Sequence, residues 1–294
     1  MGNTILEIKN LTKYYGKVRG VENLSLKLEE GEIFGFIGPN GAGKSTTIRS
    51  IMNLINKTSG EVLIENQLFQ KNDVTLKEKI GYLPSEIYLY DDLTVKEMLD
   101  YHEKFYAKNI HARRQELIKR FEIDEKKKVE DLSLGNLKKL GIVLAFMHEP
   151  KLFILDEPTS GLDPIMQNVF YDLIREEKAK GNTVFYSTHI LNEVSKVCDR
   201  VGIIKNGQLV EIEKIEDLSK KSLNFVTITS EQSQEIVNDL KVNPVSESEN
   251  TIKFGIQVAN DVFIQQLSKY KIDRILIEEA TLEDMFLHYY KEEG

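Results

Sequence analysis

The sequence contains a single cysteine, Cys198, and no tryptophan in 294 residues. One thiol cannot form an internal disulfide, which excludes a disulfide-stapled secreted fold and fits a reducing cytosol. Long apolar runs are also missing: stretches such as 142–147 and 152–155 stop far short of the roughly 18–20 residues that span a bilayer. No signal-peptide core follows Met1. With 41% hydrophobic residues, the chain is expected to bury a sizeable core in one large domain or two moderate ones.

An excess of positive charge is absent as well. The chain has 39 Lys and Arg against 47 Asp and Glu, a net charge of −8, which disfavours a nucleic-acid partner. Residues 211–294 carry 9 basic and 17 acidic side chains, so residues 1–210 keep 30 of each and are neutral. A change in composition at a fixed point predicts a domain boundary. We therefore expect domains at residues 1–215 and 216–294.

Apolar patterning in the first 210 residues predicts an α/β fold. The runs 33–37, 152–155 and 183–186 are typical of strands buried on both faces, whereas 4–8 and 24–28 alternate as half-buried antiparallel strands do. We expect a mostly parallel but mixed sheet with crossover helices. Between residues 82 and 130 the periodicity becomes helical, which predicts an all-helical subdomain at about 85–135 with helices of about three turns.

The acidic C-terminal region predicts a small α+β domain. Its expected elements follow the order β-α-β-β-α-β, the ferredoxin-like arrangement, with a last amphipathic helix at 282–290 behind a Thr281 N-cap. This domain contains no motif that carries chemistry. Either it is a regulatory, dimerising or partner-binding module, of which we favour dimer contact, or it is a solvated cap on the edge of the first domain.

A glycine-rich segment after the predicted strand 33–37 matches the phosphate-loop pattern, and a helix is expected to follow at 46–54. Glycines allow backbone N–H groups to converge on phosphate oxygens, and the helix N-terminus adds about half a positive charge. Lys44 is expected to reach the β- and γ-phosphates in a catalytic role, and Ser45 to bind Mg²⁺. The expected ATP-binding residues are Gly38, Pro39, Asn40, Gly41, Ala42, Gly43, Lys44, Ser45 and Thr46.

The buried strand 152–155 ends in two acidic residues, Asp156 and Glu157. They fall at the C-terminal edge of a parallel sheet, beside the phosphate loop, where such sheets bind ligands. Asp156 is suited to hold Mg²⁺, directly or through water. Glu157 is expected to polarise the water that attacks the γ-phosphate.

These motifs, together with three more in a fixed order, resemble the ATP-binding subunit of an ABC transporter over about residues 4–210. The further motifs are the signature segment 132–136 (Leu-Ser-Leu-Gly-Asn), Ser160-Gly161-Leu162-Asp163, and His189 after the strand 183–186. The resemblance implies two such domains paired head to tail, so that each ATP lies between one phosphate loop and the partner's signature segment. The helix expected at 137–147 would point its N-terminal dipole at that partner ATP.

The resemblance also assigns roles to single residues. It implies that Tyr15 stacks on adenine and that His189 is a catalytic residue contacting the γ-phosphate. Asp163 is the implied contact with the second subunit. The residues implied to contact the partner's ATP are Ser133, Gly135 and Asn136.

Two sites depart from the family pattern. The usual signature is Leu-Ser-Gly-Gly-Gln, and here Leu134 and Asn136 replace a glycine and the glutamine. A side chain at residue 134 limits the approach of the backbone to phosphate and removes glycine-only backbone angles. Ser85 stands where the family has a glutamine that touches Mg²⁺ and the attacking water. Serine is too short to make that contact directly. Three explanations are open: a water bridges Ser85 to the site, Glu86 takes the place of the glutamine, or ATP hydrolysis is coupled in a different way. We expect slower basal hydrolysis than with the full motifs.

The resemblance implies ATP and Mg²⁺ as cofactors, a transmembrane permease subunit in a separate chain, and a second ATPase subunit, identical or different. The chain would then lie at the cytoplasmic face of the cell membrane, held there by the membrane subunit. One ATPase domain followed by a small domain is similar to the ABC-2-like exporters of drugs, antimicrobial peptides and other amphipathic substrates. The stretch 87–93 matches the docking surface for the permease, although its apolar residues could equally be core.

The main alternative keeps the ATPase activity and drops transport. ABC-type ATPases also act on ribosomes or DNA, but the ribosomal ones carry two ATPase domains in one chain and the DNA-repair ones insert long coiled coils. The segment from Ser85 to Leu132 is too short for such an insert. A third possibility, a degenerate regulator that does not hydrolyse ATP, ranks last, because the expected catalytic and metal-binding residues are intact: Lys44, Asp156, Glu157 and His189.

Overall fold

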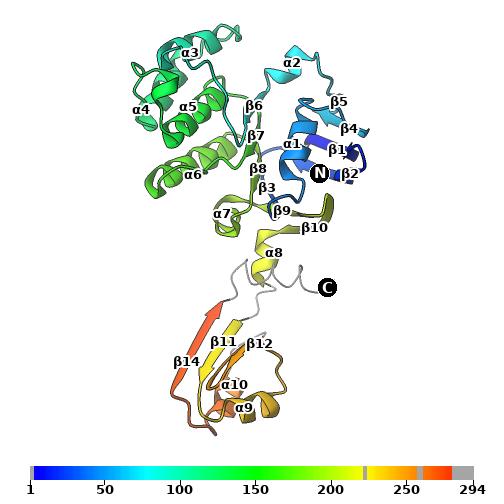
Figure 1. Cartoon of the computed structure of the whole chain (residues 1–294), viewed down its shortest axis with the longest axis vertical. Coiled ribbons are helices and arrows are strands. Elements are labelled where there is room, and N and C mark those ends of the chain that lie inside the picture. Colours follow the sequence, from blue (N-terminus) through cyan, green and yellow to red (C-terminus); the bar gives the residue numbers. More distant parts are fainter. Residues whose placement is uncertain (1–2, 221–223, 257–260, 280–294) are drawn as a thin grey trace. The chain divides into compact units, whose positions relative to one another are not determined.

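The computed structural model describes residues 3–220, 224–256 and 261–279. The chain divides into two compact units, Met1–Lys214 and Ile215–Gly294 (Figure 1). This division falls beside the boundary expected from the change in charge. Within the described ranges, no helix is both long and apolar enough to cross a membrane.

The first unit contains two sheets. The larger has the strand order β10-β9-β3-β8-β7-β6, in which β10 runs antiparallel to β9 and the other neighbours are parallel. The smaller, β2-β1-β4-β5, is antiparallel throughout. The bounds are β1 Thr4–Tyr15, β2 Val18–Glu29, β3 Ile33–Ile37, β4 Ser59–Ile64, β5 Gln67–Leu68, β6 Ile80–Leu83, β7 Leu152–Asp156, β8 Thr183–Thr188, β9 Arg200–Lys205 and β10 Gln208–Lys214.

The predicted α/β fold and its buried strands are confirmed, because β3, β7 and β8 are neighbours in the larger sheet and every residue of each is buried. The expected mixed sheet is also confirmed, because the larger sheet combines parallel neighbours with one antiparallel strand, β10. The strands expected at 4–8 and 24–28 do not supply its antiparallel part. The alternating strands β1 and β2 pair with each other in the separate antiparallel sheet. Their alternation of buried and exposed residues suits a sheet with one covered face, not the centre of a sheet covered on both.

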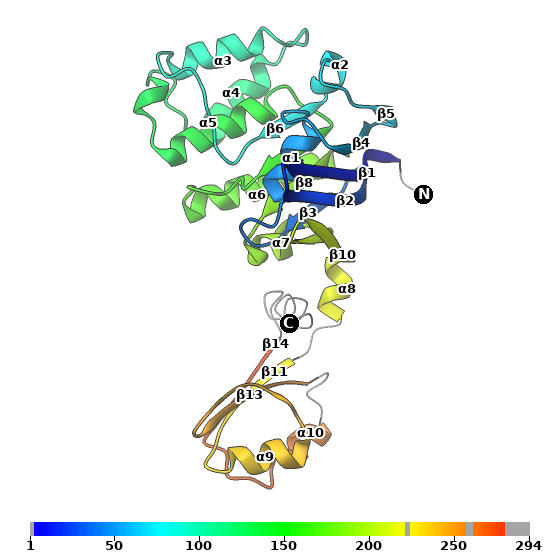
Figure 2. The same ribbon diagram turned by 45° about the vertical axis from the view of Figure 1, so that its right-hand side comes forward.

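Helices α5, α6 and α7 of the first unit contact strands of the larger sheet. In both views α3, α4 and α5 lie together at one end of this unit, and α3 and α4 each contact α5 (Figures 1 and 2). This group is the all-helical region expected from the periodicity. The bounds are α1 Lys44–Ile51, α2 Val74–Lys77, α3 Val95–Glu103, α4 His111–Arg120, the 3-10 turn Val129–Asp131, α5 Leu134–Phe146, α6 Pro164–Ala179 and α7 Leu191–Val197.

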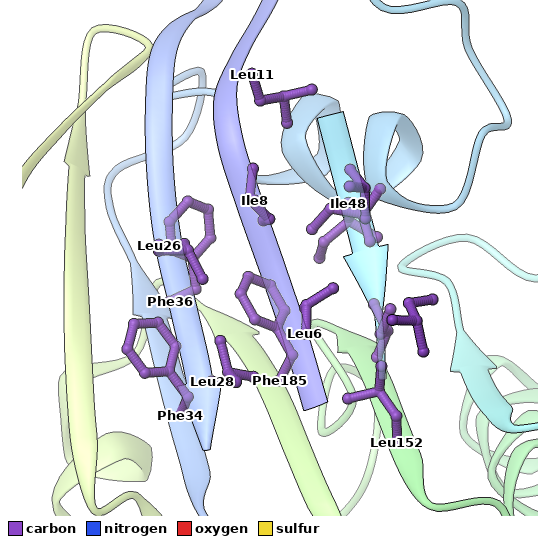
Figure 3. Close-up of a cluster of buried hydrophobic side chains, with 14 of the residues drawn as sticks. Leu6, Ile8, Leu11, Leu26, Leu28, Phe34, Phe36, Ile48, Leu152 and Phe185 are labelled. Carbon is purple, nitrogen blue, oxygen red and sulfur yellow. The ribbon is translucent and has the colours of Figure 1, made fainter. Parts of the chain in front are cut away.

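Apolar side chains from the two sheets form one buried cluster with α1. The rings of Phe34 and Phe185 stack with centroids 6.0 Å apart, and Phe36 lies 5.2 Å from Phe185. Full burial of each such side chain contributes about 1.5–3 kcal/mol. The cluster therefore fixes the strand that precedes the phosphate loop and the helix that follows it. Figure 3 shows its members, among them Leu6, Ile8, Leu26, Leu28, Phe34, Phe36, Ile48, Leu152 and Phe185.

The second unit has the element order β-α-β-β-α-β that the sequence predicts, after the short helix α8, Ile215–Lys220. Its sheet has the order β12-β13-β11-β14, with all neighbours antiparallel. A small core of apolar residues such as Val226, Ile236 and Phe254 joins the sheet to its helices. The helix expected at 282–290 lies outside the described residues. The bounds are β11 Asn224–Thr229, α9 Ser233–Leu240, β12 Pro244–Ser248, β13 Thr251–Ile256, α10 Asp261–Leu267 and β14 Arg274–Glu279.

Candidate nucleotide site

The phosphate loop, residues 38–45, connects β3 to α1. Gly43 has a φ of 110°, a conformation that residues with side chains rarely adopt. A Cβ on Gly43 would lie 2.7 Å from the carbonyl oxygen of Gly20, and one on Gly38 would lie 2.3 Å from that of Ile204. Neither position therefore has room for a side chain. The N-terminus of α1 carries no side-chain cap, so its first N–H groups are available to an anion.

Helix α1 begins at Lys44 and ends at Ile51, earlier at both ends than the expected 46–54. It starts at Lys44 because Gly43 already serves as its N-cap. It ends where Asn53 takes a left-handed φ of 53°, a common way for helices to stop. Thr46 consequently lies in the first turn, next to the loop.

Lys44 is buried, with 6% of its surface exposed. Its ammonium donates hydrogen bonds to the carbonyl oxygens of Gly38 at 2.7 Å and Pro39 at 3.3 Å, and lies 3.7 Å from Oε1 of Glu157. Burial lowers the pKa of Lys44, while the carboxylates of Glu157 and Asp156 oppose that shift. The ammonium is therefore held on the inside of its own loop, where phosphate oxygens would lie.

Asp156, the last residue of β7, is almost fully buried, and its Oδ1 accepts a hydrogen bond from Ser187 Oγ at 3.1 Å. Helix α1, which carries Ser45, contacts β7. Nowhere in ranges 3–220, 224–256 and 261–279 do three or more His, Cys, Asp or Glu form a group that could hold a metal ion. One carboxylate and one hydroxyl suit Mg²⁺ when nucleotide phosphates and water supply the other ligands. These residues therefore fit a magnesium ion that arrives with a nucleotide.

Glu157 follows β7 in the left-handed conformation, with a φ of 48°. For a residue with a side chain this conformation costs about 1–3 kcal/mol, so neighbouring groups must hold it. The Glu157 N–H donates to the carbonyl oxygen of Ser187 at 3.0 Å. Its own carbonyl oxygen accepts from Lys138 Nζ at 3.2 Å and from the N–H of Ser160 at 3.3 Å. The backbone of Glu157 is thus fixed from three segments.

The carboxylate of Glu157 lies between Lys44 and His189. His189 Nδ1 is 2.9 Å from both carboxylate oxygens. Because a carboxylate only accepts hydrogen bonds, this contact assigns the proton to Nδ1 and leaves Nε2 facing away. His189 follows β8, and 48% of its side chain is exposed. Two of the three predicted catalytic side chains, Glu157 and His189, therefore lie in direct contact at the ends of neighbouring parallel strands.

Tyr15, at the end of β1, is half exposed, and Lys13 Nζ lies 4.8 Å from the centroid of its ring. A Cβ on Gly20 would lie 3.0 Å from both the Tyr15 ring and Cγ2 of Thr46. Tyr15 is therefore close to the start of α1. Together these contacts bring Tyr15, the phosphate loop, Asp156, Glu157 and His189 to one region at the carboxyl ends of β3, β7 and β8.

The signature segment lies against the turn at 160–163. Ser133 caps α5, because its Oγ accepts from the N–H of Asn136 at 3.3 Å, and so α5 begins at Leu134 and not at the expected 137. A Cβ on Gly135 would lie 2.7 Å from the carbonyl oxygen of Gly161, so glycine is required there. Leu134 has ordinary helical geometry and is 81% exposed. The loss of glycine-only angles, expected to matter at residue 134, has no consequence for this backbone.

Asp163 is the N-cap of α6. Its Oδ1 accepts hydrogen bonds from the N–H groups of Ile165 and Met166, both at 3.0 Å. Such a cap stabilises a helix by about 1 kcal/mol. Asp163 therefore has a structural role within one chain, and its contact with a second subunit stays a prediction.

Ser85 is half-buried just after β6, and its carbonyl oxygen accepts a hydrogen bond from Lys138 Nζ at 3.0 Å. The carboxylate of Glu86 accepts from the hydroxyl of Tyr88 at 2.9 Å and is exposed. The backbone of residue 85 is thus tied to α5, whichever of the three explanations for its short side chain applies.

Two residues near the site were not predicted from the sequence. Lys138 of α5 donates hydrogen bonds to the carbonyl oxygens of Ser85 and Glu157. Glu193 of α7 is 4% exposed and accepts hydrogen bonds from Tyr186 Oη at 2.9 Å, from Thr188 Oγ1 at 2.7 Å and from Thr159 Oγ1. It therefore ties the segment after Glu157 to the end of β8, just before His189. The sequence offered no signal for either, since both look like exposed charges on helices.

Comparisons with known proteins place the chain among ATP-binding proteins of transporters. The family model described as ABC transporter matches residues 21–160. The linearmycin resistance ATP-binding protein LnrL of Bacillus subtilis is 35% identical, covering 97% of this chain and 97% of its own. The bacitracin transport ATP-binding protein BcrA of Bacillus licheniformis is 37% identical over 80% of this chain and 78% of its own.

Solved structures of ATP-binding cassettes also resemble this chain. An ATP-binding subunit of an ABC transporter superposes with a TM-score of 0.68 at 32% identity, covering 74% of this chain and 92% of that one. A dimeric ATP-binding cassette in a post-hydrolysis state, bound to ADP and Pi, superposes with a TM-score of 0.65 at 27% identity, covering 72% of this chain and 99% of that one.

Proposed function

The chain belongs to the ABC transporter family as an ATP-binding, ATP-hydrolysing subunit, and we propose that it powers export of drugs, antimicrobial peptides or other amphipathic substrates through a separate membrane subunit. The observation that carries the proposal is the grouping of Lys44, Glu157 and His189 within contact distance at the carboxyl ends of parallel strands. The proposed substrate class follows two relatives, a linearmycin resistance ATP-binding protein and a bacitracin transport ATP-binding protein.

Each site residue has a role in this proposal. The loop N–H groups and Lys44 bind the β- and γ-phosphates, and Tyr15 stacks on adenine. Ser45 and Asp156 hold Mg²⁺, which when bound neutralises phosphate charge. Glu157 orients the attacking water. His189, held at Nδ1 by Glu157, presents Nε2 to the γ-phosphate.

A second ATPase subunit, identical or different, is proposed to complete the site. The N-terminus of α5, capped by Ser133, offers partial positive charge to a phosphate that a second subunit binds. Gly135 and Asn136 contact that nucleotide, and Asp163 the second subunit. Two large apolar side chains on this side of the chain, Leu134 and Ile165, are 81% and 72% exposed. A second subunit would cover them, and a solved relative is dimeric.

The membrane subunit is proposed to dock on exposed aromatic side chains of the helical region. Tyr88 and Phe105 are 85% and 58% exposed, and the rings of Tyr90, Tyr101 and Phe105 pack edge to face in series. Ile87, by contrast, packs toward α5, since its Cδ1 lies 2.4 Å from where a Cβ on residue 141 would be. In this proposal the docking stretch 87–93 contributes its tyrosines, while the half-buried Ile87 packs on α5. This partner would hold the chain at the cytoplasmic face of the membrane.

Co-purification tests the function directly. The tagged chain is isolated from native membranes with mild detergent, and bound chains are identified by mass, with the Lys44→Met variant as a matched control for nucleotide dependence. We expect a protein with several membrane spans, and ATPase activity that falls to a small but measurable residual rate in Glu157→Gln. Recovery of ribosomes or DNA in its place would contradict export and support the alternative that drops transport.

A further inference from the structure

One residue of α5, Lys138, contacts the backbone of Glu157 and not its carboxylate. We propose that Lys138 is a positioning residue for ATP hydrolysis, whose ammonium fixes the backbone of Glu157 and thereby the direction of its carboxylate. This inference rests on the role proposed above for Glu157. Lys138 itself touches neither the phosphate loop nor the carboxylate.

The ammonium of Lys138 is buried and fully hydrogen-bonded. The residue is 5% exposed, and Nζ donates to the carbonyl oxygens of Ser85 at 3.0 Å, Glu157 at 3.2 Å and Pro84 at 3.4 Å. A lysine ammonium has three N–H donors, and these three acceptors use all of them. One ammonium therefore links α5 to two other segments: Pro84 and Ser85 after β6, and Glu157 after β7.

Charge as well as hydrogen bonding keeps the ammonium in this position. Burial lowers the pKa of Lys138, whereas the carboxylates of Asp156 and Glu157 raise it. An uncharged replacement of similar shape would keep the packing and lose both the donors and the charge. Lys139, the next residue on the helix, is half-buried and makes none of these contacts with residues 84, 85 and 157.

Glu157 depends on such external contacts because its φ of 48° is unfavourable for a residue with a side chain. The N–H is held by Ser187 of β8, and the carbonyl by Ser160 of the following turn and by Lys138. Without the ammonium, the carbonyl of Glu157 keeps only the 3.3 Å hydrogen bond from Ser160, so the peptide can shift and the carboxylate is held less firmly against His189. A shift of about 1 Å at a catalytic group lowers kcat by about 100-fold.

The test is a double-mutant cycle of Lys138→Met with Glu157→Gln, read as kcat for ATP hydrolysis in single-turnover conditions and as Kd for ATP. We expect Lys138→Met to lower kcat by about 10- to 100-fold and to leave the Kd for ATP within about twofold. Lys138→Arg should recover part of the loss. In the Glu157→Gln background, Lys138→Met should cost little more, because both changes act through one carboxylate. Lys139→Met is the matched control and should retain wild-type kcat.

Other results would overturn the inference. Wild-type kcat in Lys138→Met, or an equal loss in both backgrounds, would show that Lys138 does not act through Glu157. If Lys138→Met fails to fold, as judged by thermal unfolding, the same cycle with Lys138→Gln decides the question. Full activity in Glu157→Gln would instead overturn the role proposed for Glu157, and so the two failures are distinguishable.

Discussion

Lowering the pH from 7 to 5 is expected to destabilise the first unit through His148, which follows α5. This ring is 7% exposed and stacks on Tyr106 with centroids 4.3 Å apart. Its Nε2 lies 3.2 Å from the carbonyl oxygen of Ile80, and its Nδ1 has no hydrogen-bond partner among the described residues. Burial, with a smaller contribution from the charge of His102, lowers the pKa of His148 to about 4.

The sign and size of the effect follow from proton linkage. In the unfolded chain a histidine has a pKa of about 6.5, so between pH 6.5 and 4 the unfolded state binds a proton that the folded state does not. The free energy of unfolding therefore falls as the pH falls through this window. With pKa values of about 6.5 and about 4, the loss is about 2 kcal/mol between pH 7 and pH 5. For a unit of this size that lowers Tm by about 4–8 °C.

Scanning calorimetry of wild type and His148→Phe at pH 7 and pH 5 measures the effect. Phenylalanine keeps a ring against Tyr106 and cannot titrate, so its Tm should fall by about 4–8 °C less than that of wild type. Ile80→Val is the matched control: it changes the core beside the same ring without removing a titratable group, and should preserve the wild-type difference between the two pH values. Equal pH dependence in wild type and His148→Phe would refute the reasoning.

Three further predictions follow from single contacts. Gly43 has a φ of 110° and lies beside a backbone carbonyl, so Gly43→Ala should weaken ATP binding at least about tenfold, as measured by titration calorimetry. Gly181→Ala is the control: with a φ of 89° and open space around it, this variant should lose about 1 kcal/mol of stability and keep its affinity for ATP. Glu193→Gln places an amide N–H₂ among hydroxyl donors and should cost about 1–3 kcal/mol in denaturant unfolding. Arg113→Met leaves the buried Glu177 carboxylate without its arginine and should cost about 3 kcal/mol, while Arg175→Met, from an exposed pair, should cost less than about 1 kcal/mol.

The fold was predictable where burial is continuous along the chain. The runs that became β3, β7 and β8 consist of apolar residues bounded by polar ones, and such runs predict strands without knowledge of their partners. Which sheet a strand joins depends on pairing with distant residues. The assignment of β1 and β2 to a separate sheet is fixed by β4, which pairs with β1 from about fifty residues away, and no local pattern contains that information.

The candidate site was predictable where local geometry dictates residue type. Gly38 and Gly43 are required by close backbone contacts, and the Asp156-Glu157 pair by its place at the end of a buried strand. Lys138 could not be found in this way. Its three acceptors belong to residues 84, 85 and 157, and nothing in the sequence separates Lys138 from Lys139.

The conformation of Glu157 explains why such residues matter to the chemistry. Glycine would adopt a φ of 48° at no cost, but it carries no carboxylate to orient a water. With glutamate at this position, the unfavourable backbone conformation is held by three hydrogen bonds, which involve Ser187 of β8, Ser160 of the following turn and Lys138 of α5. Because α5 also begins at the signature segment and holds the backbone of Ser85, movement of that helix changes one of the three constraints on the carboxylate. The position of the Glu157 carboxylate, the proposed catalytic group, is therefore sensitive to α5, the helix proposed to meet the second nucleotide.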